Sequence, residues 1–162
     1  MDYFEKFYNK ALKFLSYRPR SEKEVRNKLK IKSEKLKIED STAIIDRVIQ
    51  KLKEYKFLDD VEFAKKWIES RLRFRPRSLR LIKIELKRKG IDPETIDKMI
   101  NDEGLMINDL ENAKKLIQKK LERFKSSSKE EIYQKLGRFL ASKGFDWDTI
   151  KKSIDEVLKK GV

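Results

Sequence analysis

The residues best placed to do chemistry in this sequence are the cationic side chains between positions 71 and 90. Nine basic residues and one acid, Glu85, fall in this segment, which gives it a net charge of +8. Six of the nine are arginines, and guanidinium groups pair bidentately with phosphate and carboxylate. The pattern predicts an anion-binding strip that consists of Arg71, Arg73, Arg75, Arg77, Arg80, Lys83, Lys87, Arg88 and Lys89.

Part of this strip has a counterpart elsewhere in the chain. The tetrapeptide Arg-Pro-Arg-Ser occupies positions 18–21 and again 75–78, a shift of 57 residues, and a version without the proline follows at 123–126. We therefore add Arg18, Arg20, Arg123 and Lys125 to the candidate partner- or nucleic-acid-binding residues. The alternative is that these cations form only the solvated face of basic helices, and the sequence leaves both interpretations open.

An aromatic residue accompanies each of these basic turns. Tyr17, Phe74 and Phe124 each lie just before or within the turn between two predicted helices. Stacking on the bases of a single strand is one possible role. We favour the other, in which each ring fills the space between helices as a hydrophobic plug.

A second echo shows that the chain repeats one structural unit. The segment 89–96 (KGIDPETI) returns as 143–150 (KGFDWDTI), a shift of 54 residues. Together with the first echo, it predicts three units at residues 1–57, 58–104 and 105–162. Tandem units of this kind usually present a surface instead of enclosing a pocket.

Each unit is predicted to contain three helices, because leucine and isoleucine recur three and four residues apart and glycine and proline are rare. Capping boxes at Ser21 and Ser128 and caps at Asp59, Asp92 and Asp146 mark the helix starts. The fold class is thus all-α, a tandem array of three three-helix repeats that we expect to form an elongated, curved molecule. The expected helices are 3–16, 22–34, 41–55, 60–73, 79–89, 93–103, 108–124, 129–143 and 147–160.

Apolar residues recur in register on these helices and predict the core. On the second helices Val25 and Leu29 correspond to Ile82 and Leu86 and then to Ile132 and Leu136. On the third helices Ile44 and Val48 correspond to Ile96 and Ile100 and then to Ile150 and Ile154. Their helical spacing favours packing inside the protein over any cofactor role.

Composition points to a binding protein and away from an enzyme. The chain has 42 basic against 28 acidic residues, a net charge of +14 that favours an anionic partner. It contains no cysteine and no histidine, so thiolate metal sites, a cysteine nucleophile and an imidazole base are all excluded. No Gly-rich phosphate loop or catalytic spacing is present, and we expect no metal and no cofactor.

The termini and hydropathy bear on where the protein acts. The first residues do not resemble a signal peptide, and no apolar run has the length of a membrane span. We expect a soluble, cytoplasmic monomer that makes no contact with a membrane.

A helix-turn-helix reader of DNA sequence is the main alternative among binding proteins. The third helix of the middle unit, 93–103, carries four acidic residues and one lysine. A helix with a net charge of −3 does not enter a groove lined by phosphates. Weak, nonspecific affinity for single- and double-stranded DNA remains compatible with the sequence.

Three motifs, in order along the chain, resemble the RecX family. They are the opening segment from Ala11 to Leu29, the central signature 55–64 (YKFLDDVEFA) with 84–91 (IELKRKGI), and the C-terminal stretch 135–150. The resemblance spans nearly the whole chain. Family members commonly have glycine where Lys56 stands, and another glycine near Arg75-Pro76.

The resemblance implies a bacterial regulator of the RecA recombinase. Proteins of this family are similar in binding along the groove of the RecA–DNA filament and in limiting its extension, ATP hydrolysis and strand exchange during DNA repair and recombination. The family has no catalytic residues to transfer to this chain. A nonspecific DNA-binding helical protein without a RecA-specific role is the alternative.

Overall fold

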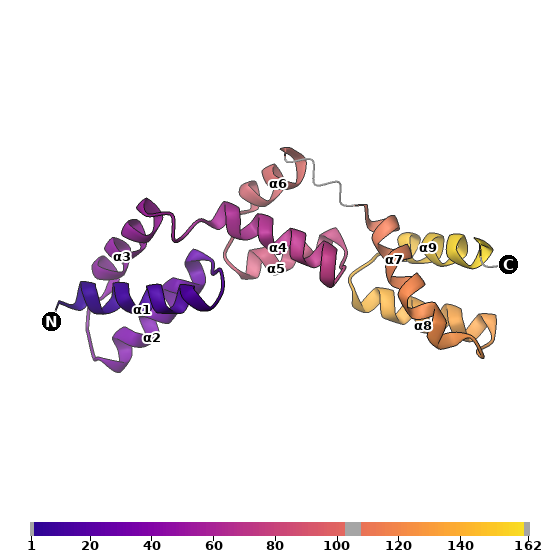
Figure 1. Ribbon diagram of the computed structural model, residues 1–162, viewed down its shortest axis with the longest axis horizontal. Helices are drawn as coiled ribbons and strands as arrows, with labels where there is room; N and C mark the ends of the chain where they lie inside the picture. Colours follow the sequence, from indigo (N-terminus) through magenta and orange to yellow (C-terminus); the bar gives the residue numbers. More distant parts are fainter. Residues whose placement is uncertain (1, 103–107, 161–162) are drawn as a thin grey trace. The chain divides into compact units, whose positions relative to one another are not determined.

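The computed structural model describes residues 2–102 and 108–160. In these residues every element of regular secondary structure is a helix (Figure 1). The α-helices are α1 (Tyr3–Tyr17), α2 (Glu22–Lys35), α3 (Thr42–Glu54), α4 (Asp60–Phe74), α5 (Leu79–Arg88), α6 (Pro93–Asp102), α7 (Asp109–Leu121), α8 (Lys129–Ser142) and α9 (Trp147–Lys160), with a 3₁₀ turn η1 (Glu122–Phe124) after α7.

The all-helical prediction and its nine helices are confirmed within the described residues, and the caps explain where the helices begin. Ser21 forms the full capping box with Glu24 at the start of α2. Asp59 accepts hydrogen bonds from two backbone N–H groups of α4, and Asp92 and Asp146 each accept one from the threonine three residues later. The predicted last residue of the helix 93–103 lies outside the described residues.

The described chain forms two compact units. One comprises Met1–Lys66 with Leu86–Ile96, and the other comprises Trp67–Glu85 with Asp97–Val162. The division passes through α4, α5 and α6, so each unit holds one outer repeat and part of the middle one. The predicted boundary at 57/58 stays a prediction, and the boundary at 104/105 lies outside the described residues.

Each unit has its own apolar core. In the first, α1, α2 and α3 bury a cluster that includes Phe7, Leu29 and Leu52. In the second, α7, α8 and α9 bury a cluster that includes Ile117, Leu140 and Ile154. Of the twelve core positions predicted in register, nine are buried, and Ile44, Ile100 and Ile132 are only partly buried.

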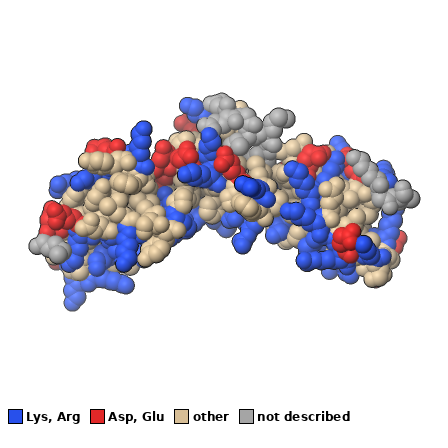
Figure 2. All heavy atoms as spheres, viewed as in Figure 1, with Lys and Arg blue, Asp and Glu red and all other residues tan. Residues whose placement is uncertain are grey.

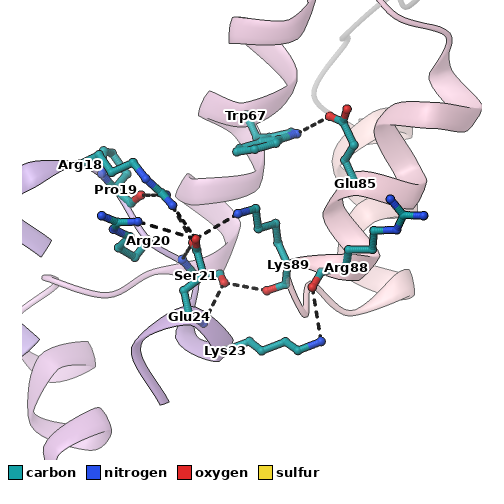
Figure 3. Close-up of polar contacts among 10 residues, drawn as sticks. All are labelled: Arg18, Pro19, Arg20, Ser21, Lys23, Glu24, Trp67, Glu85, Arg88 and Lys89. Carbon is teal, nitrogen blue, oxygen red and sulfur yellow. Dashed lines mark hydrogen bonds and ion pairs between the residues drawn. The ribbon is translucent and has the colours of Figure 1, made fainter. Parts of the chain in front are cut away.

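The first unit contains a joint between the first and second repeats, here called the first joint (Figure 3). The Ser21 hydroxyl donates a hydrogen bond of 2.6 Å to the carbonyl of Lys89, in the turn after α5. The Lys23 ammonium donates to the carbonyl of Arg88 at 3.3 Å. The backbone N–H of Glu22 donates to the carboxylate of Asp60 at 2.8 Å. The start of α2 is thus held by groups of the next repeat.

The second unit contains the equivalent second joint, between the second and third repeats. The Ser78 backbone N–H donates to the carbonyl of Lys143 at 3.0 Å, in the turn after α8. The backbone N–H of Leu79 donates to the carboxylate of Asp109 at 2.9 Å. The two sequence echoes are therefore the two halves of one contact, since Arg-Pro-Arg-Ser of one repeat meets Lys-Gly of the next.

A left-handed glycine makes each joint possible. Gly90 and Gly144 have φ of 83° and 86°, a conformation that glycine adopts without steric cost. The following residues, Ile91 and Phe145, donate back to the carbonyls of Leu86 and Leu140, which closes a Schellman motif at the end of α5 and of α8. The turn thereby exposes its carbonyl to the neighbouring repeat.

Lys56 also has a left-handed backbone, with φ of 56°. This is the position at which the resemblance to the RecX family implies a glycine. A lysine at this position keeps the turn, but its Cβ atom makes the left-handed conformation less favourable than it is for glycine.

The first joint also holds a carboxylate whose charge is strongly stabilised. Glu24 accepts hydrogen bonds from the Arg18 guanidinium at 2.6 Å, the Lys89 ammonium at 3.0 Å and the backbone N–H of Ser21 at 3.0 Å. Burial alone would raise its pKa, but these partners outweigh burial and lower the pKa of Glu24 to about 2.

We predict that Gly144→Ala destabilises the protein by about 2–4 kcal/mol, because strain at positive φ adds to overpacking. A Cβ atom at this position would lie 2.6 Å from the Ser78 hydroxyl oxygen and 2.8 Å from the Cβ of Leu81. Gly137→Ala is the matched control, since a Cβ there meets nothing within 4 Å and is expected to stabilise α8 by about 0.5–1 kcal/mol. Urea unfolding measures both; a wild-type midpoint for Gly144→Ala would contradict the joint.

We also predict that the stability supplied by Glu24 depends on pH. Its pKa is lowered on folding, so this stability is present above the unfolded value of 4.5 and is lost as the pH falls towards about 2. The stability difference between the wild type and Glu24→Gln should therefore be largest near neutral pH and shrink below pH 4.5.

Urea unfolding at a series of pH values measures this difference. Glu34→Gln is the control, because Glu34 lies exposed on the same helix and has no ion-pair partner in the described part of the chain. A gap between the wild type and Glu24→Gln that stays constant down to a pH of about 2 would contradict the role given to the carboxylate.

Candidate binding surface

The structure divides the thirteen predicted binding cations into two groups. Seven of them, here called the paired cations, contact a carboxylate of the protein itself: Arg18, Arg20, Arg71, Arg77, Lys83, Lys89 and Lys125. The other six, here called the exposed cations, have no carboxylate partner among the described residues: Arg73, Arg75, Arg80, Lys87, Arg88 and Arg123.

Glu85, the one acid of the basic segment, gathers two of its arginines. The Arg71 guanidinium donates to the Glu85 carboxylate at 2.7 Å, and Arg77 forms a second ion pair with it. The indole N–H of Trp67 donates to the same carboxylate at 2.9 Å, and Arg71 stacks over the Trp67 ring. Burial would raise the pKa of Glu85, but the bonds from Arg71 and Trp67 outweigh it and lower the pKa.

The equivalent arginine of the first repeat also turns inward. Arg20 lies 4.0 Å above the centre of the Phe14 ring, with its side chain only 16% exposed. Burial, with the nearby charge of Arg18, lowers the pKa of Arg20. The Nε atoms of Arg20 and Arg77 are both buried without a hydrogen-bond partner in the described residues. The second arginine of Arg-Pro-Arg-Ser therefore packs and pairs within the protein in both copies.

Two of the paired cations, Lys83 and Lys125, form weaker ion pairs on the surface. Lys83 contacts Asp97 at 2.8 Å, and Lys125 contacts Glu122 at 2.5 Å with both side chains more than 70% exposed. Exposed pairs of this kind contribute about 0.2–1 kcal/mol. Lys83 and Lys125 therefore stay within reach of a partner.

The exposed cations are the predicted binding residues that the fold leaves in water without a carboxylate partner among the described residues. Arg75 lies in the turn before α5, Arg80 and Lys87 are on α5 itself, and Arg123 is in η1. Lysine and arginine side chains are plentiful on the face shown in Figure 2, whereas acidic side chains form smaller groups there. An unpaired, solvated guanidinium keeps its full charge available to an external phosphate or carboxylate.

The expectation of a hydrophobic plug is wrong for two of the three aromatic residues. Tyr17 is 72% exposed and Phe74 is 67% exposed. Phe124 does pack against the core of the third repeat, and Lys135 lies 5.6 Å from the centre of its ring. The two exposed rings each immediately precede an Arg-Pro-Arg-Ser turn, so they belong to the candidate surface.

Two features of this surface could not be anticipated from the basic runs of the sequence. One is the pair of carboxylates, Glu24 and Glu85, that withdraw arginines from solvent. The other is Lys115 and Lys119 of α7, which lie in a groove with Arg73 and Pro76. Neither lysine stands in a basic run as conspicuous as 71–89, and only the fold brings them next to the turn.

Other kinds of site are not found in the described part of the chain. It contains no group of three or more acidic side chains that could hold a metal ion. No helix among the described residues is long and apolar enough to cross a membrane.

The chain matches three family models, one for each repeat. Residues 8–52 match the first three-helix domain of RecX, residues 59–100 match the second, and residues 108–154 match the third. Together these matches cover most of the chain, in the order predicted from the sequence echoes.

Curated relatives named "Regulatory protein RecX" agree with this assignment. The chain is 36% identical over 150 residues to that of Clostridioides difficile, which covers 93% of this chain and 67% of the relative. It is 37% identical to that of Clostridium tetani, with 97% and 69% covered. For Bacillus subtilis the identity is 35%, and the chain spans only 56% of that longer relative.

Solved structures show the same fold. The crystal structure of RecX from Lactobacillus salivarius is similar with a TM-score of 0.73 and 27% sequence identity, covering 95% of this chain and 96% of that one. A second crystal structure, of a regulatory protein RecX, has a TM-score of 0.72. From its three matched domains, its relatives and its fold, this chain belongs to the RecX family.

Proposed function

We propose that this protein binds the RecA–DNA nucleoprotein filament and modulates it, mainly by inhibiting ATP hydrolysis, filament extension and strand exchange. The observation that carries the proposal is membership of a family whose curated relatives are named regulatory proteins. The exposed cations, in both compact units, supply positive charge suited to a filament that contains DNA.

The proposed mechanism is occupancy and needs no catalytic residue. Long-range attraction by the exposed cations accelerates docking, and desolvated aromatic and apolar contacts lengthen residence. A bound regulator then blocks the approach of the next RecA subunit and hinders the movements that accompany ATP hydrolysis.

The exposed cations are better candidates for the filament contact than the paired ones. A guanidinium already bound to a half-buried carboxylate has part of its field cancelled, and its release costs the fold an ion pair. Arg71 and Arg77 are of this kind, since the Glu85 side chain they share is only 11% exposed. Arg75, Arg80 and Lys87 have no such tie among the described residues.

A nonspecific DNA-binding role without RecA is the second candidate. The exposed Phe74 beside the exposed Arg75 favours it, because single-strand grooves combine aromatic rings with cations. In that case binding to bare DNA would be as tight as binding to the filament. We propose that the protein acts as a monomer in either role.

We predict that the protein lowers ATP turnover by RecA on single-stranded DNA when present at fewer molecules than RecA. Capping or blocking a filament affects many subunits for each regulator bound, so sub-stoichiometric action is expected. A coupled ATPase assay measures it. Unchanged turnover at saturating protein would exclude the RecA-specific role, and the same titration on bare DNA by anisotropy would then test the second candidate.

We predict further that Arg75→Ala, Arg80→Ala and Lys87→Ala together weaken filament binding roughly tenfold at moderate salt, at about 0.5 kcal/mol for each exposed charge. Urea stability should stay at the wild-type value, because none of the three has a carboxylate partner among the described residues. The matched control removes three exposed lysines of the first repeat, Lys13, Lys30 and Lys35.

The paired arginines give the contrasting result. Arg71→Ala with Arg77→Ala should lower stability by about 1–3 kcal/mol, since Glu85 loses its two cationic partners. If this variant folds normally and loses filament binding more than the exposed triple variant does, the interface lies on the Glu85 cluster instead.

A further inference from the structure

Each joint carries a groove on its surface, and the two grooves are equivalent by sequence. The first groove, of about 600 Å³, lies between the end of α1 with its Arg-Pro-Arg turn and the start of α4; Leu15, Pro19 and Lys66 are among its lining residues. The second, of about 470 Å³, lies between the end of α4 with its turn and α7; Leu72, Pro76 and Lys115 line it.

The correspondence between the lining residues is systematic. Leu15 and Pro19 match Leu72 and Pro76 by the 57-residue shift of Arg-Pro-Arg-Ser. Lys66 matches Lys115 by a shift of 49, the same shift that relates the joint residues Asp60 and Asp109. The repeat therefore reproduces a groove with an apolar floor and a lysine on the helix of the next repeat.

The second groove is lined entirely by cationic, apolar and uncharged polar residues. Arg73, Lys115 and Lys119 supply three positive charges, and no acidic residue of the described chain contributes to it. All three side chains are exposed and lack a carboxylate partner in the described residues. The charge of this groove is complementary to a polyanion, a polymer in which negative groups recur along the chain.

The first groove has the same character with more internal pairing. Arg18, Arg20, Lys56 and Lys66 line it, against two acids. One of these acids, Asp59, caps α4, and the other, Glu62, contacts Lys66 at 3.9 Å. Phe57, a lining residue that is 53% exposed, adds a second aromatic ring to this groove.

An exposed aromatic ring stands beside each groove, at the matching positions 17 and 74. Tyr17 lines the first groove, and Phe74 follows Arg73 of the second. The Arg73 guanidinium lies 5.1 Å from the centre of the Phe74 ring, and a large part of that ring still faces solvent. Both copies of the turn thus present a solvent-facing ring beside cations, an arrangement on which a base can stack.

We propose that the two grooves are single-stranded nucleic-acid sites, each with one base stacked on Tyr17 or Phe74 and with the sugar–phosphate backbone along the groove cations. Aromatic rings next to Lys and Arg are the elements from which sequence-independent single-strand sites are built. Duplex DNA does not fit this arrangement, because its bases already stack on each other. The site is independent of RecA, so its test contains none.

The test measures anisotropy of a fluorescein-labelled oligothymidylate with the full chain. The double variant Phe74→Ala with Tyr17→Ala should weaken binding about 5- to 100-fold, the loss expected for one stacked base in each groove, whereas each single variant leaves the other groove intact. Trp147→Ala is the control, since Trp147 is 63% exposed and lines neither groove. Equal affinity of the wild type and the double variant would overturn the proposal.

A salt series tests the cations. Removing Lys115 and Lys119 together should reduce the slope of log affinity against log salt by about 0.7 for each phosphate that these lysines neutralise in the wild type. The control removes two exposed lysines of α9, Lys151 and Lys152, and should leave more of the slope intact. Equal slopes for the two variants would place the phosphates elsewhere.

Stacking has its own optical signature. In Phe74→Trp, binding of oligothymidylate should quench the new tryptophan, whereas a duplex competitor should not. If poly-glutamate binds as tightly as the oligonucleotide and depends equally on Phe74, the groove recognises an acidic polypeptide and the nucleic-acid assignment is wrong. If the wild type binds the oligonucleotide as predicted but does not inhibit the filament, the proposed function is wrong and the two nucleic-acid sites stand.

Discussion

The tandem arrangement is built on how the second helices of the first two repeats satisfy their first backbone N–H groups. A helix leaves four such groups without intrahelical partners, and burying them unpaired is costly. At the first joint Asp60 accepts from the N–H of Glu22, and at the second Asp109 accepts from the N–H of Leu79. Both acceptors belong to the following repeat. In the first two repeats, one of the first backbone N–H groups of the second helix therefore has its acceptor in the next repeat, which couples neighbouring repeats.

Within the Arg-Pro-Arg-Ser motif, some residues form the joint and others lie on the surface. Its serine is buried in both copies, and its second arginine turns inward in both. The first arginine differs, because the acid Glu24 of the first repeat corresponds to Leu81 in the second. Arg18 is consequently bound to Glu24, whereas Arg75 has no carboxylate partner within the described residues. One acidic position thus decides whether the first arginine of the motif has a carboxylate partner within the described residues.

Local signals in the sequence predicted the helices and their caps, because those depend on near neighbours. Tertiary pairing was not predictable in this way, and the Glu85 cluster shows why: its partners approach from α4 and from the turn before α5. Helical periodicity separates Phe124 from Tyr17. The core face of α7 and η1 runs through Ile117 and Leu121 to Phe124, so that ring is on the face. The core face of α1 runs through Phe7 and Ala11 towards position 18, which leaves Tyr17 about 100° away from it.

Net charge alone would have made every arginine and lysine a binding candidate. The internal carboxylates reduce that set, and they do so across the whole physiological pH range, since Glu24 keeps its charge down to a pKa of about 2. The chain has no histidine and no cysteine, the side chains that most often change charge near neutrality. The cationic pattern is therefore fixed by the fold and insensitive to pH, but it remains open to screening, because the exposed cations lie in water. Affinity for an anionic partner should accordingly be governed by ionic strength and by competition from other polyanions.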